Sequence, residues 1–303
     1  MRNYKKVLAI VLLLLACLTF TGCANTAYMT SKLGDGFGFW DIFVYPMAGV
    51  MWLVGQSIGA HNYALTIIFS TLIVRTIAWP IYAKSNDQQL KMKLMQPELN
   101  KLEEKYANRT DQESAQRKSM EQMQLYKKYG VGIGGCIMPF IQMPIFLGFY
   151  YALRKLPASM VEGHWLNIFK TTSFFGVDLT MEMSNEAATQ TQKVGVIVLA
   201  VLVGITQVIS IILSEARQKK MTEEQQSNVP EYRRPQQNQQ AKSSAMMMKV
   251  MMYFFAVMMV VFVLQSPAAL GLYWVIGNIY STLQSWIGSL TSKKRMEQLK
   301  KKY

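Results

Sequence analysis

The apolar run YALTIIFSTLIVRTIAWPIY, residues 63–82, determines the architecture of this chain more than any other segment does. It is long enough to cross a bilayer as a helix, because about 20 apolar residues at ~1.5 Å each span the hydrocarbon core. Arg75 interrupts the run roughly 10 Å from its Tyr82 end. An arginine at that depth costs about 2.5–3.5 kcal/mol even on lenient insertion scales. Arg75 is therefore either a functional site or a side chain that reaches back to the nearer headgroups.

The composition of the chain predicts an all-α polytopic membrane protein. Apolar residues make up 51% of the 303 residues, and 22 residues are methionines, which is too apolar for an ordinary soluble domain. The net charge of +14 comes from Lys and Arg that cluster between apolar runs, so membrane topology explains it better than sequence-specific nucleic-acid binding does. The three cysteines and two histidines lack the spacing of a zinc site or a disulfide framework, and we expect no metal ion and no cofactor.

The N-terminus has the pattern of a removable signal peptide. Basic residues precede a short apolar stretch, and small residues follow it up to Gly22 and Cys23. The ending is similar to a lipoprotein processing box, in which Cys23 becomes the lipid-modified first residue. Cys17 lies in a competing box with a shorter apolar core, so Cys23 is favoured and Cys17 stays open.

The rest of the sequence predicts five transmembrane helices in the plasma membrane. The N-terminus is expected outside the cell and the C-terminus in the cytoplasm. The expected segments are a signal peptide at 1–22, a lipidated N-terminus and extracellular interfacial helix at 23–60, spans at 61–83, 131–153, 194–213, 246–264 and 267–290, a cytoplasmic helical hairpin at 84–130, an extracellular loop at 154–193, a cytoplasmic loop at 214–245 and a basic cytoplasmic tail at 291–303. Lys and Arg number 22 over the inner segments 84–129, 214–245 and 291–303 and 3 over the outer segments 24–58 and 156–193, as the positive-inside rule requires. We place 37–59 in the outer interface because Asp41 and Pro46 disfavour burial.

Two of the charged segments predict different local structures. Within 84–130, apolar residues such as Met95 and Leu99 keep a helical spacing, which predicts a loosely packed, mobile hairpin with a thin apolar face. The segment 214–245 is rich in Gln and Arg and contains Pro, which predicts a disordered loop.

Polar side chains in other predicted spans lie near the depth of Arg75. Arg75, Gln207 and Gln284 are each about six or seven residues from the cytoplasmic end of their helices, and we expect them to form a wet recess open to the cytoplasm. The alternative is that such groups only join helices, at about 0.6 kcal/mol each. For Gln142 or Asn278 alone that explanation suffices. Arg75 is harder to dismiss, because no intramembrane Asp or Glu is available to pair with it.

Motifs that suggest catalysis or nucleotide binding lack their structural context. Residues 55–59, GQSIG, match a nucleophile elbow, but no strand precedes them and neither His61 nor His164 has an indicated acid partner. Glycines 130, 132 and 135 match a dinucleotide fingerprint, yet no strand precedes them and a membrane helix follows. We expect a protein that is not an enzyme.

Three features together resemble the YidC-type membrane insertase family, in its branch with a lipoprotein signal. They are MPFIQMPIF at 138–146, GLYWVIGN at 271–278, and the span of Arg75 followed by a charged hairpin. The resemblance covers about residues 38–290 and implies five helices around a hydrophilic groove that is open to cytoplasm and lipid. It implies that Arg75 is the groove arginine. The other positions expected in the groove are Gln142, Gln207, Tyr273, Trp274, Asn278 and Gln284.

This resemblance implies an insertase, which moves a short polar segment of a new membrane protein through the inner leaflet while the apolar helix passes into lipid. Nascent membrane proteins, lipoproteins among them, would be the substrates, and Arg75 would attract their acidic residues. The Sec translocon stays open as a partner because the sequence does not decide it, and the ribosome stays open because the basic tail is short and the 214–245 loop is long. The alternatives are a small-solute transporter, for which we find no internal repeats, and a membrane assembly factor without insertase activity.

Overall fold

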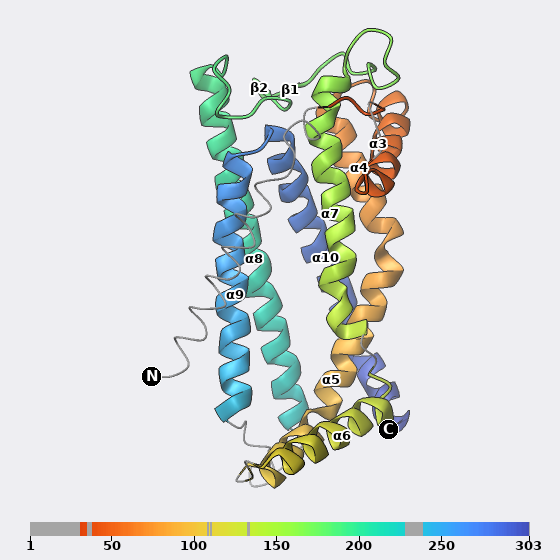
Figure 1. The fold of residues 1–303 in the computed structure, drawn as a ribbon, viewed down its shortest axis with the longest axis vertical. Coiled ribbons are helices and arrows are strands. Elements are labelled where there is room, and N and C mark those ends of the chain that lie inside the picture. The colour runs from red at the N-terminus through yellow and green to blue at the C-terminus, as the bar shows by residue number, and fades with distance from the viewer. Residues whose placement is uncertain are drawn as a thin grey trace. The chain divides into compact units, whose positions relative to one another are not determined.

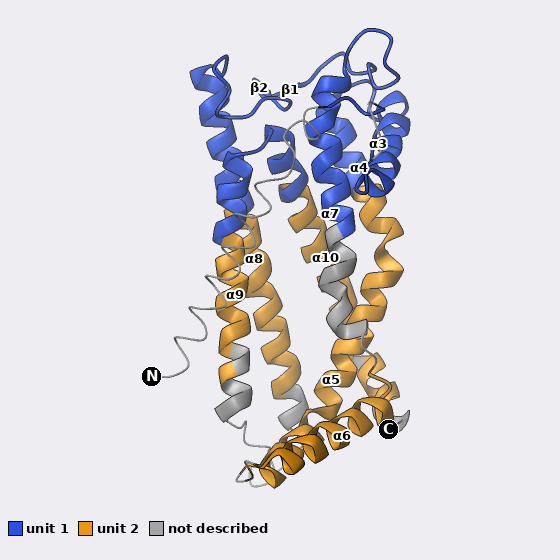
Figure 2. Cartoon of the chain, in the orientation of Figure 1, with its two compact units in different colours: residues 1–71, 144–203, 257–274 blue, residues 72–143, 204–256, 275–303 orange. Residues whose placement is uncertain are grey.

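The computed structural model is mostly helical and describes residues 31–34, 38–107, 109, 111–131, 134–227 and 239–302 (Figure 1). Among these, the side chains of 134–143, 224–227, 239–242, 244, 245, 293 and 300–302 are not described. Cys17 and Cys23, the two candidate lipidation residues, lie outside the described residues. The chain divides into two compact units (Figure 2). Unit 1 comprises residues 1–71, 144–203 and 257–274, and unit 2 comprises residues 72–143, 204–256 and 275–303.

The elements follow one another as a series of helices with one small hairpin of strands. In chain order they are α3 (Asp41–Gln56), α4 (Tyr63–Ile77), α5 (Trp79–Lys105), α6 (Gln112–Lys128), α7 (Gly134–Ser159), β1 (Ser173–Phe174), β2 (Val177–Asp178), α8 (Gln190–Ser227), α9 (Gln239–Leu264) and α10 (Ala268–Lys302). The strands are antiparallel, and the turn between them has positive φ at Phe175 and Gly176, as a type I′ hairpin requires.

Several of these helices have the length and apolarity of membrane spans. Within the described residues, two pass on their own, Gln190–Glu223 in α8 and Met246–Leu264 in α9. Helices α4 and α5 pass as a pair bent by 52°, which raises the number to three if the pair is one span. On α8, Ile197, Val201 and Ile205 follow one another at intervals of four and are about half exposed, so they present an apolar face that lipid tails can cover. The chain is a helical membrane protein, and the count of five spans stays a prediction.

In unit 1, helix α3 packs through one stripe of side chains. Val44, Ala48 and Met51 are fully buried and lie three or four residues apart, so they share one helix face. Helix α7 approaches α3 closely at Gly148, where an added Cβ would lie 2.7 Å from the Phe43 carbonyl oxygen. The glycine is required there because any side chain would push the two helices apart.

Aromatic rings fill a second part of unit 1 and join α7 to α10. Phe149 stacks on Tyr273 with the ring centroids 4.7 Å apart, and Phe146 lies 5.4 Å from Trp274. Such pairs contribute about 0.5–1.5 kcal/mol beyond the area that they bury. Tyr273 and Trp274, which the sequence places in a groove, therefore belong to an aromatic cluster in this unit.

In unit 2, helix α5 turns back through α6 as a helical hairpin. Met95, Leu99 and Tyr129 form a small buried cluster between the two helices. Ion pairs flank this cluster at Lys128 with Glu98, 2.8 Å, and at Lys105 with Glu121, 2.7 Å. The apolar contact is thin and the charged rim is extensive, as the spacing of apolar residues in 84–130 indicates. That the hairpin lies in the cytoplasm stays a prediction.

The segment expected to be disordered and the basic tail are both helical where they are described. Helix α8 continues to Ser227 and α9 begins at Gln239, so the disordered loop expected over 214–245 is wrong for these parts of it. Helix α10 runs to Lys302 through the segment expected to be a tail. Composition misleads here because Glu, Lys, Gln and Met favour helices, and a helix that continues from a packed span needs no new nucleation. Met296 and Leu299 of α10 are buried against Leu90 of α5, which anchors the extension.

Candidate functional site

Arg75 occupies the last turn of α4 and is only 8% exposed. Its Nη1 donates a hydrogen bond to Ser281 Oγ of α10. The guanidinium lies against the backbone of that helix at Gly277, where an added Cβ would be 2.6 Å from Nη2 and 3.2 Å from Cζ. A glycine at this position is therefore what allows the cation to lie flat on α10.

No carboxylate neutralises this cation among the residues that the structure describes. The ion pairs formed there by residues 72–143, 204–256 and 275–303 involve other cations, and no described carboxylate lies within 4.0 Å of the Arg75 guanidinium nitrogens. Its Nε is buried and makes no hydrogen bond with the described part of the chain. Arg75 thus combines burial, a positive charge and an unused donor, which is the state of a group that can accept an incoming anion.

Hydroxyl and amide groups surround this part of α10. Thr76 and Tyr280 share a hydrogen bond of 2.8 Å, and Asn278 Nδ2 donates to Thr206 Oγ1 over 3.2 Å. A further hydroxyl pair joins α8 to α10 and consists of Ser210 and Thr282. These contacts place neutral polar groups on α4, α8 and α10 within one stretch of unit 2. Such groups can exchange partners with a passing polar chain at little cost, because each bond contributes only about 0.6 kcal/mol.

The structure divides the predicted groove residues between the two units. Arg75, Gln207, Asn278 and Gln284 belong to unit 2. Asn278 and Gln284 are 7% and 8% exposed, and Gln207 is half-buried next to Thr206. Tyr273 and Trp274 belong to unit 1, and the side chain of Gln142 is not described. The groove as a whole stays a prediction.

Sequence reasoning missed several residues that contact Arg75 or its neighbours. Ser281, Gly277 and Tyr280 lie within or just after the motif at 271–278, but a serine, a glycine or a tyrosine in an apolar helix carries no distinctive signal. The signal that was available is spacing, since Gly277 and Ser281 are four residues apart and share a face of α10.

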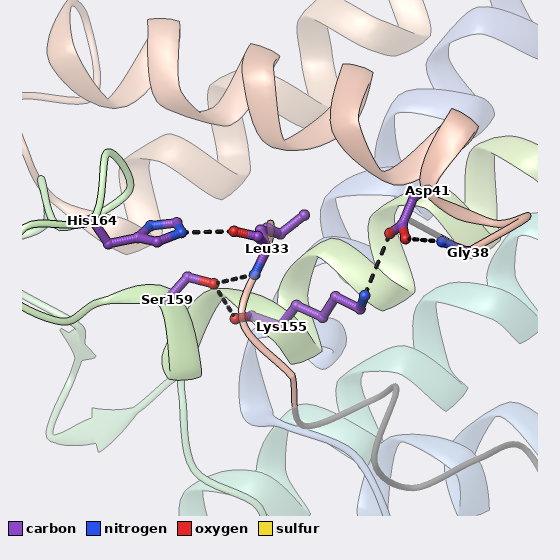
Figure 3. A network of polar contacts seen from close by, with 6 residues as sticks. All are labelled: Leu33, Gly38, Asp41, Lys155, Ser159 and His164. Carbon is purple, nitrogen blue, oxygen red and sulfur yellow. Dashed lines mark hydrogen bonds and ion pairs between the residues drawn. The ribbon is translucent and has the colours of Figure 1, made fainter. Parts of the chain in front are cut away.

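A second polar network, in unit 1, holds the chain that precedes α3 (Figure 3). Lys155 Nζ lies 3.4 Å from Asp41 Oδ1, and the two side chains are 2% and 1% exposed. Asp41 Oδ2 also accepts a hydrogen bond of 2.7 Å from the Gly38 N–H. Asp41 is thus buried within the protein because Lys155 supplies a counter-charge 114 residues away in the sequence, and the placement of this helix in the outer interface stays a prediction.

The same network captures the backbone of Leu33. Ser159 Oγ accepts from the Leu33 N–H over 2.9 Å, and His164 Nε2 donates to the Leu33 carbonyl over 2.8 Å (Figure 3). Since His164 Nδ1 accepts from the Leu166 N–H, the proton of a neutral imidazole is on Nε2. The segment just after the predicted lipidation site is thus tied to the end of α7 and to the loop that follows it.

Charged groups of the α5–α6 hairpin have shifted pKa values because they are hydrogen-bonded to one another. The Lys128 ammonium lowers the pKa of Glu98, and the Lys105 ammonium lowers the pKa of Glu121. A hydrogen bond from the Ser114 N–H lowers the pKa of Asp111, which caps helix α6. All three carboxylates are ionised at neutral pH, so exposed ion pairs and a cap accompany the small buried cluster of the hairpin.

Apolar outward faces together with a buried cation among hydroxyl groups define a class, the integral membrane proteins with a polar site inside their helices. The chain belongs to the family described as 60Kd inner membrane protein, whose model matches residues 53–298. This is the YidC-type family that the motifs at 138–146 and 271–278 resemble, and the predicted family is confirmed, whereas its branch with a lipoprotein signal stays a prediction.

Known relatives cover most of this chain. It is 29% identical over 289 residues to membrane protein insertase YidC 2 of Bacillus anthracis, which is 93% of each chain. It is 30% identical over 255 residues to membrane protein insertase MisCA of Bacillus subtilis, which is 84% of this chain and 80% of the relative. A third relative, YidC 2 of Listeria innocua, is 29% identical over 300 residues, 98% of this chain and 88% of the relative.

Proposed function

We propose that this protein is a membrane protein insertase, which moves short polar segments of newly made membrane proteins across the inner leaflet. Three relatives that carry the insertase name over at least four fifths of both chains support the assignment. No covalent step is needed, because the protein lowers a barrier that arises from desolvating the polar segment.

The single observation that carries the proposal is the buried, unneutralised guanidinium of Arg75. An acidic residue of the translocated segment would gain roughly 4 kcal/mol from a cation at about 4 Å in an effective dielectric near 20, before desolvation. The hydroxyl groups around Ser281 and Asn278 would replace part of the water that the segment loses. The interaction with Arg75 is temporary, because the polar segment crosses the membrane while the apolar helix of the substrate passes into the lipid.

The full proposed layout has five spans around a groove that opens to the cytoplasm and to lipid. The groove is lined by Arg75 and by the other predicted positions, which are Gln142, Gln207, Tyr273, Trp274, Asn278 and Gln284. The N-terminus lies outside and carries a lipid on Cys23, and the C-terminus lies in the cytoplasm. The excess of basic residues on the inner segments supports this orientation. Nascent membrane proteins are the substrates, with the Sec translocon and the ribosome as further candidate partners.

The test is insertion into vesicles whose only protein is this chain. A single-span substrate with a short translocated tail should become protease-protected in these vesicles and not in empty ones. A matched control is Arg117→Ala, which removes an arginine of the exposed face of α6, and it should insert as well as the wild type. If vesicles with this protein protect no more tail than empty vesicles, the chain is an assembly factor rather than an insertase. Cysteines at positions 115 and 230 should be labelled from the cytoplasmic side alone.

A further inference from the structure

Helices α5 and α10 enclose a cavity within unit 2. Its volume is about 410 Å³, and its walls include Trp79 and Tyr82 from the start of α5 and Gln284 from α10. A volume of this size is within the range of about 300–1,000 Å³ that is typical of ligand pockets. The lining contains both apolar and charged side chains, which indicates an amphiphilic ligand.

The cavity is apolar at one end and charged at the other. The two helices run in the same direction here, because Trp79 contacts Tyr280 at 6.2 Å between ring centroids, whereas Asp87 pairs with Arg295 at 2.6 Å. Residue order along α5 and α10 therefore follows the long axis of the cavity. Its beginning is lined by aromatic and aliphatic side chains together with the amide of Gln284. Its end, where Lys294 lies, is lined by hydroxyl, amide and charged side chains together with Leu90.

The charged end of the cavity carries one positive charge that is not neutralised. Arg295 is bound to both carboxylate oxygens of Asp87 through three contacts of 2.6–3.2 Å, so these two residues cancel. Lys294 lines the cavity as well and makes no ion pair with any residue that the structure describes. The net charge there is positive, which favours an anion.

A buried donor inside the cavity lacks a partner. Gln284 is 8% exposed and lines the cavity, and its buried Nε2 makes no hydrogen bond with any residue described in the structure. Buried polar groups are nearly always paired, so an unpaired amide that lines a cavity indicates an acceptor oxygen from a bound molecule. Gly288 lies one turn further along α10 and faces the amide of Asn86 on α5. An added Cβ at Gly288 would lie 2.8 Å from Asn86 Nδ2.

We propose that this cavity binds the headgroup of an anionic phospholipid, with the phosphate at Lys294, an ester oxygen at Gln284 and acyl carbon against Trp79. A phospholipid matches the gradient from apolar to charged, whereas free phosphate uses only the charged end. Trp and Tyr at a helix end suit the depth of lipid headgroups, and basic pockets between helices on the cytoplasmic side are suited to anionic headgroups. Gln284 also belongs to the positions proposed for the groove, so the lipid site is tested by lipid binding and the insertase function is tested by insertion.

The test is photocrosslinking of the full-length protein in detergent with a photoreactive phosphatidylglycerol. Crosslinks should map to peptides of 79–91 and 284–298. Phosphatidylglycerol should compete for them, whereas phosphatidylcholine with the same acyl chains and inorganic phosphate should not. Lys294→Gln should weaken labelling about five-fold, the effect of one lysine at a charged surface. Gln284→Leu should weaken it too. The matched control Lys219→Gln removes a lysine from the exposed end of α8 and should change nothing.

Each contrary result overturns the proposal in a different way. Equal competition by phosphatidylcholine shows contact with bulk lipid only, and equal competition by inorganic phosphate shows a simple anion site. Stronger competition by an acidic peptide shows that the cavity belongs to the path of the substrate. Because Lys294 is exposed, Lys294→Gln is not expected to disturb folding, and unchanged labelling of that variant refutes the assigned phosphate position.

Discussion

Lys155 in unit 1 and Arg75 in unit 2 are both buried cations, and they differ in what neutralises them. Lys155 is 2% exposed and lies 3.4 Å from a carboxylate that is 1% exposed. Arg75 is 8% exposed, and its neighbours are the hydroxyl of Ser281 and the backbone at Gly277. The first cation has a permanent partner within the protein, and the second has only neutral ones among the described residues.

This difference separates a structural charge from one available for binding. A buried pair whose partners are both fixed contributes to a unique arrangement of the chain, here by holding α3 against the end of α7. A buried cation without a carboxylate keeps its desolvation cost, and an anion that reaches it relieves that cost. The same burial therefore predicts opposite consequences of mutation in the two units.

The largest effect is expected at the pair in unit 1. Lys155→Met leaves the Asp41 carboxylate buried without its counter-charge, and removing one partner of a buried pair costs about 3–5 kcal/mol. The double variant Asp41→Asn with Lys155→Met should recover most of that loss, because the asparagine oxygen can still accept from the Gly38 N–H. The measurement is unfolding of the purified protein in detergent with increasing denaturant. A loss below ~1 kcal/mol in the single variant, the range of exposed pairs, would show that the pair is solvated.

At Arg75 the expected loss is in insertion rather than in folding. Arg75→Ala should lower insertion of substrates with acidic tails about ten-fold, which corresponds to about 1.4 kcal/mol, and Arg75→Glu should lower it further. Arg75→Lys should keep most activity, because a cation remains although the planar fork is lost. Substrates with neutral tails should change little. Equal protein levels are the control, and acidic tails that insert normally with Arg75→Ala would make this arginine a structural residue.

A smaller effect is expected at the glycine that supports Arg75. Gly277→Ala places a Cβ 2.6 Å from Nη2 and must displace the guanidinium, but the charge remains. We expect insertion of substrates with acidic tails to fall about three-fold, an effect between those of wild type and Arg75→Ala. A three-fold change corresponds to about 0.7 kcal/mol, half of the energy expected for Arg75→Ala. Gly49→Ala is the matched control, because nothing lies within 4 Å of a Cβ there. If Gly277→Ala and Gly49→Ala insert acidic tails equally well, the position of the guanidinium does not matter for insertion.

Much of the fold was predictable from sequence, and so was the buried cation Arg75. An arginine inside an apolar run is visible without a structure, because its cost depends on the run itself, and Gln284 and Asn278 are visible for the same reason. The hydroxyl groups of Ser281 and Thr282 were not, since serine and threonine are ordinary in membrane helices and the rotation of each helix is set by packing.

The pair in unit 1 was beyond sequence reasoning for a different reason. Asp41 and Lys155 are 114 residues apart, and nothing local to either residue indicates the other. The same is true of α10, where Met296 and Leu299 have a helical spacing that acquires meaning only when Leu90 is found beside them. Patterns within one helix could therefore be predicted from the sequence, whereas contacts between helices that are distant in the sequence required the structure.

The smallest effect concerns a third group of charges, those of the α5–α6 hairpin, whose ion pairs are exposed. Hydrogen bonds from Lys128 and Lys105 lower the pKa of Glu98 and of Glu121 in the folded hairpin. A lowered folded pKa means that the stabilisation is present above the unfolded pKa and is lost as pH falls through the folded one. The same hydrogen bonds raise the pKa of Lys105 and Lys128, so a second loss begins only above the ordinary lysine range.

Protection of the hairpin amides against hydrogen exchange should therefore be flat near neutral pH and fall below about pH 4, the ordinary range of glutamate. Because the pairs are exposed and screened, the change should be small, and high salt should reduce it. The measurement is the protection factor of peptides in 84–130, corrected for the intrinsic pH dependence of exchange. Glu98→Gln with Glu121→Gln should remove the part of the acid-dependent loss that comes from these two pairs, leave the part that comes from the Asp111 cap, and leave peptides of α8 unchanged. If wild type and this double variant lose protection at the same pH, the thin cluster at Met95 and Leu99 holds the hairpin, and exposed charges contribute nothing to it.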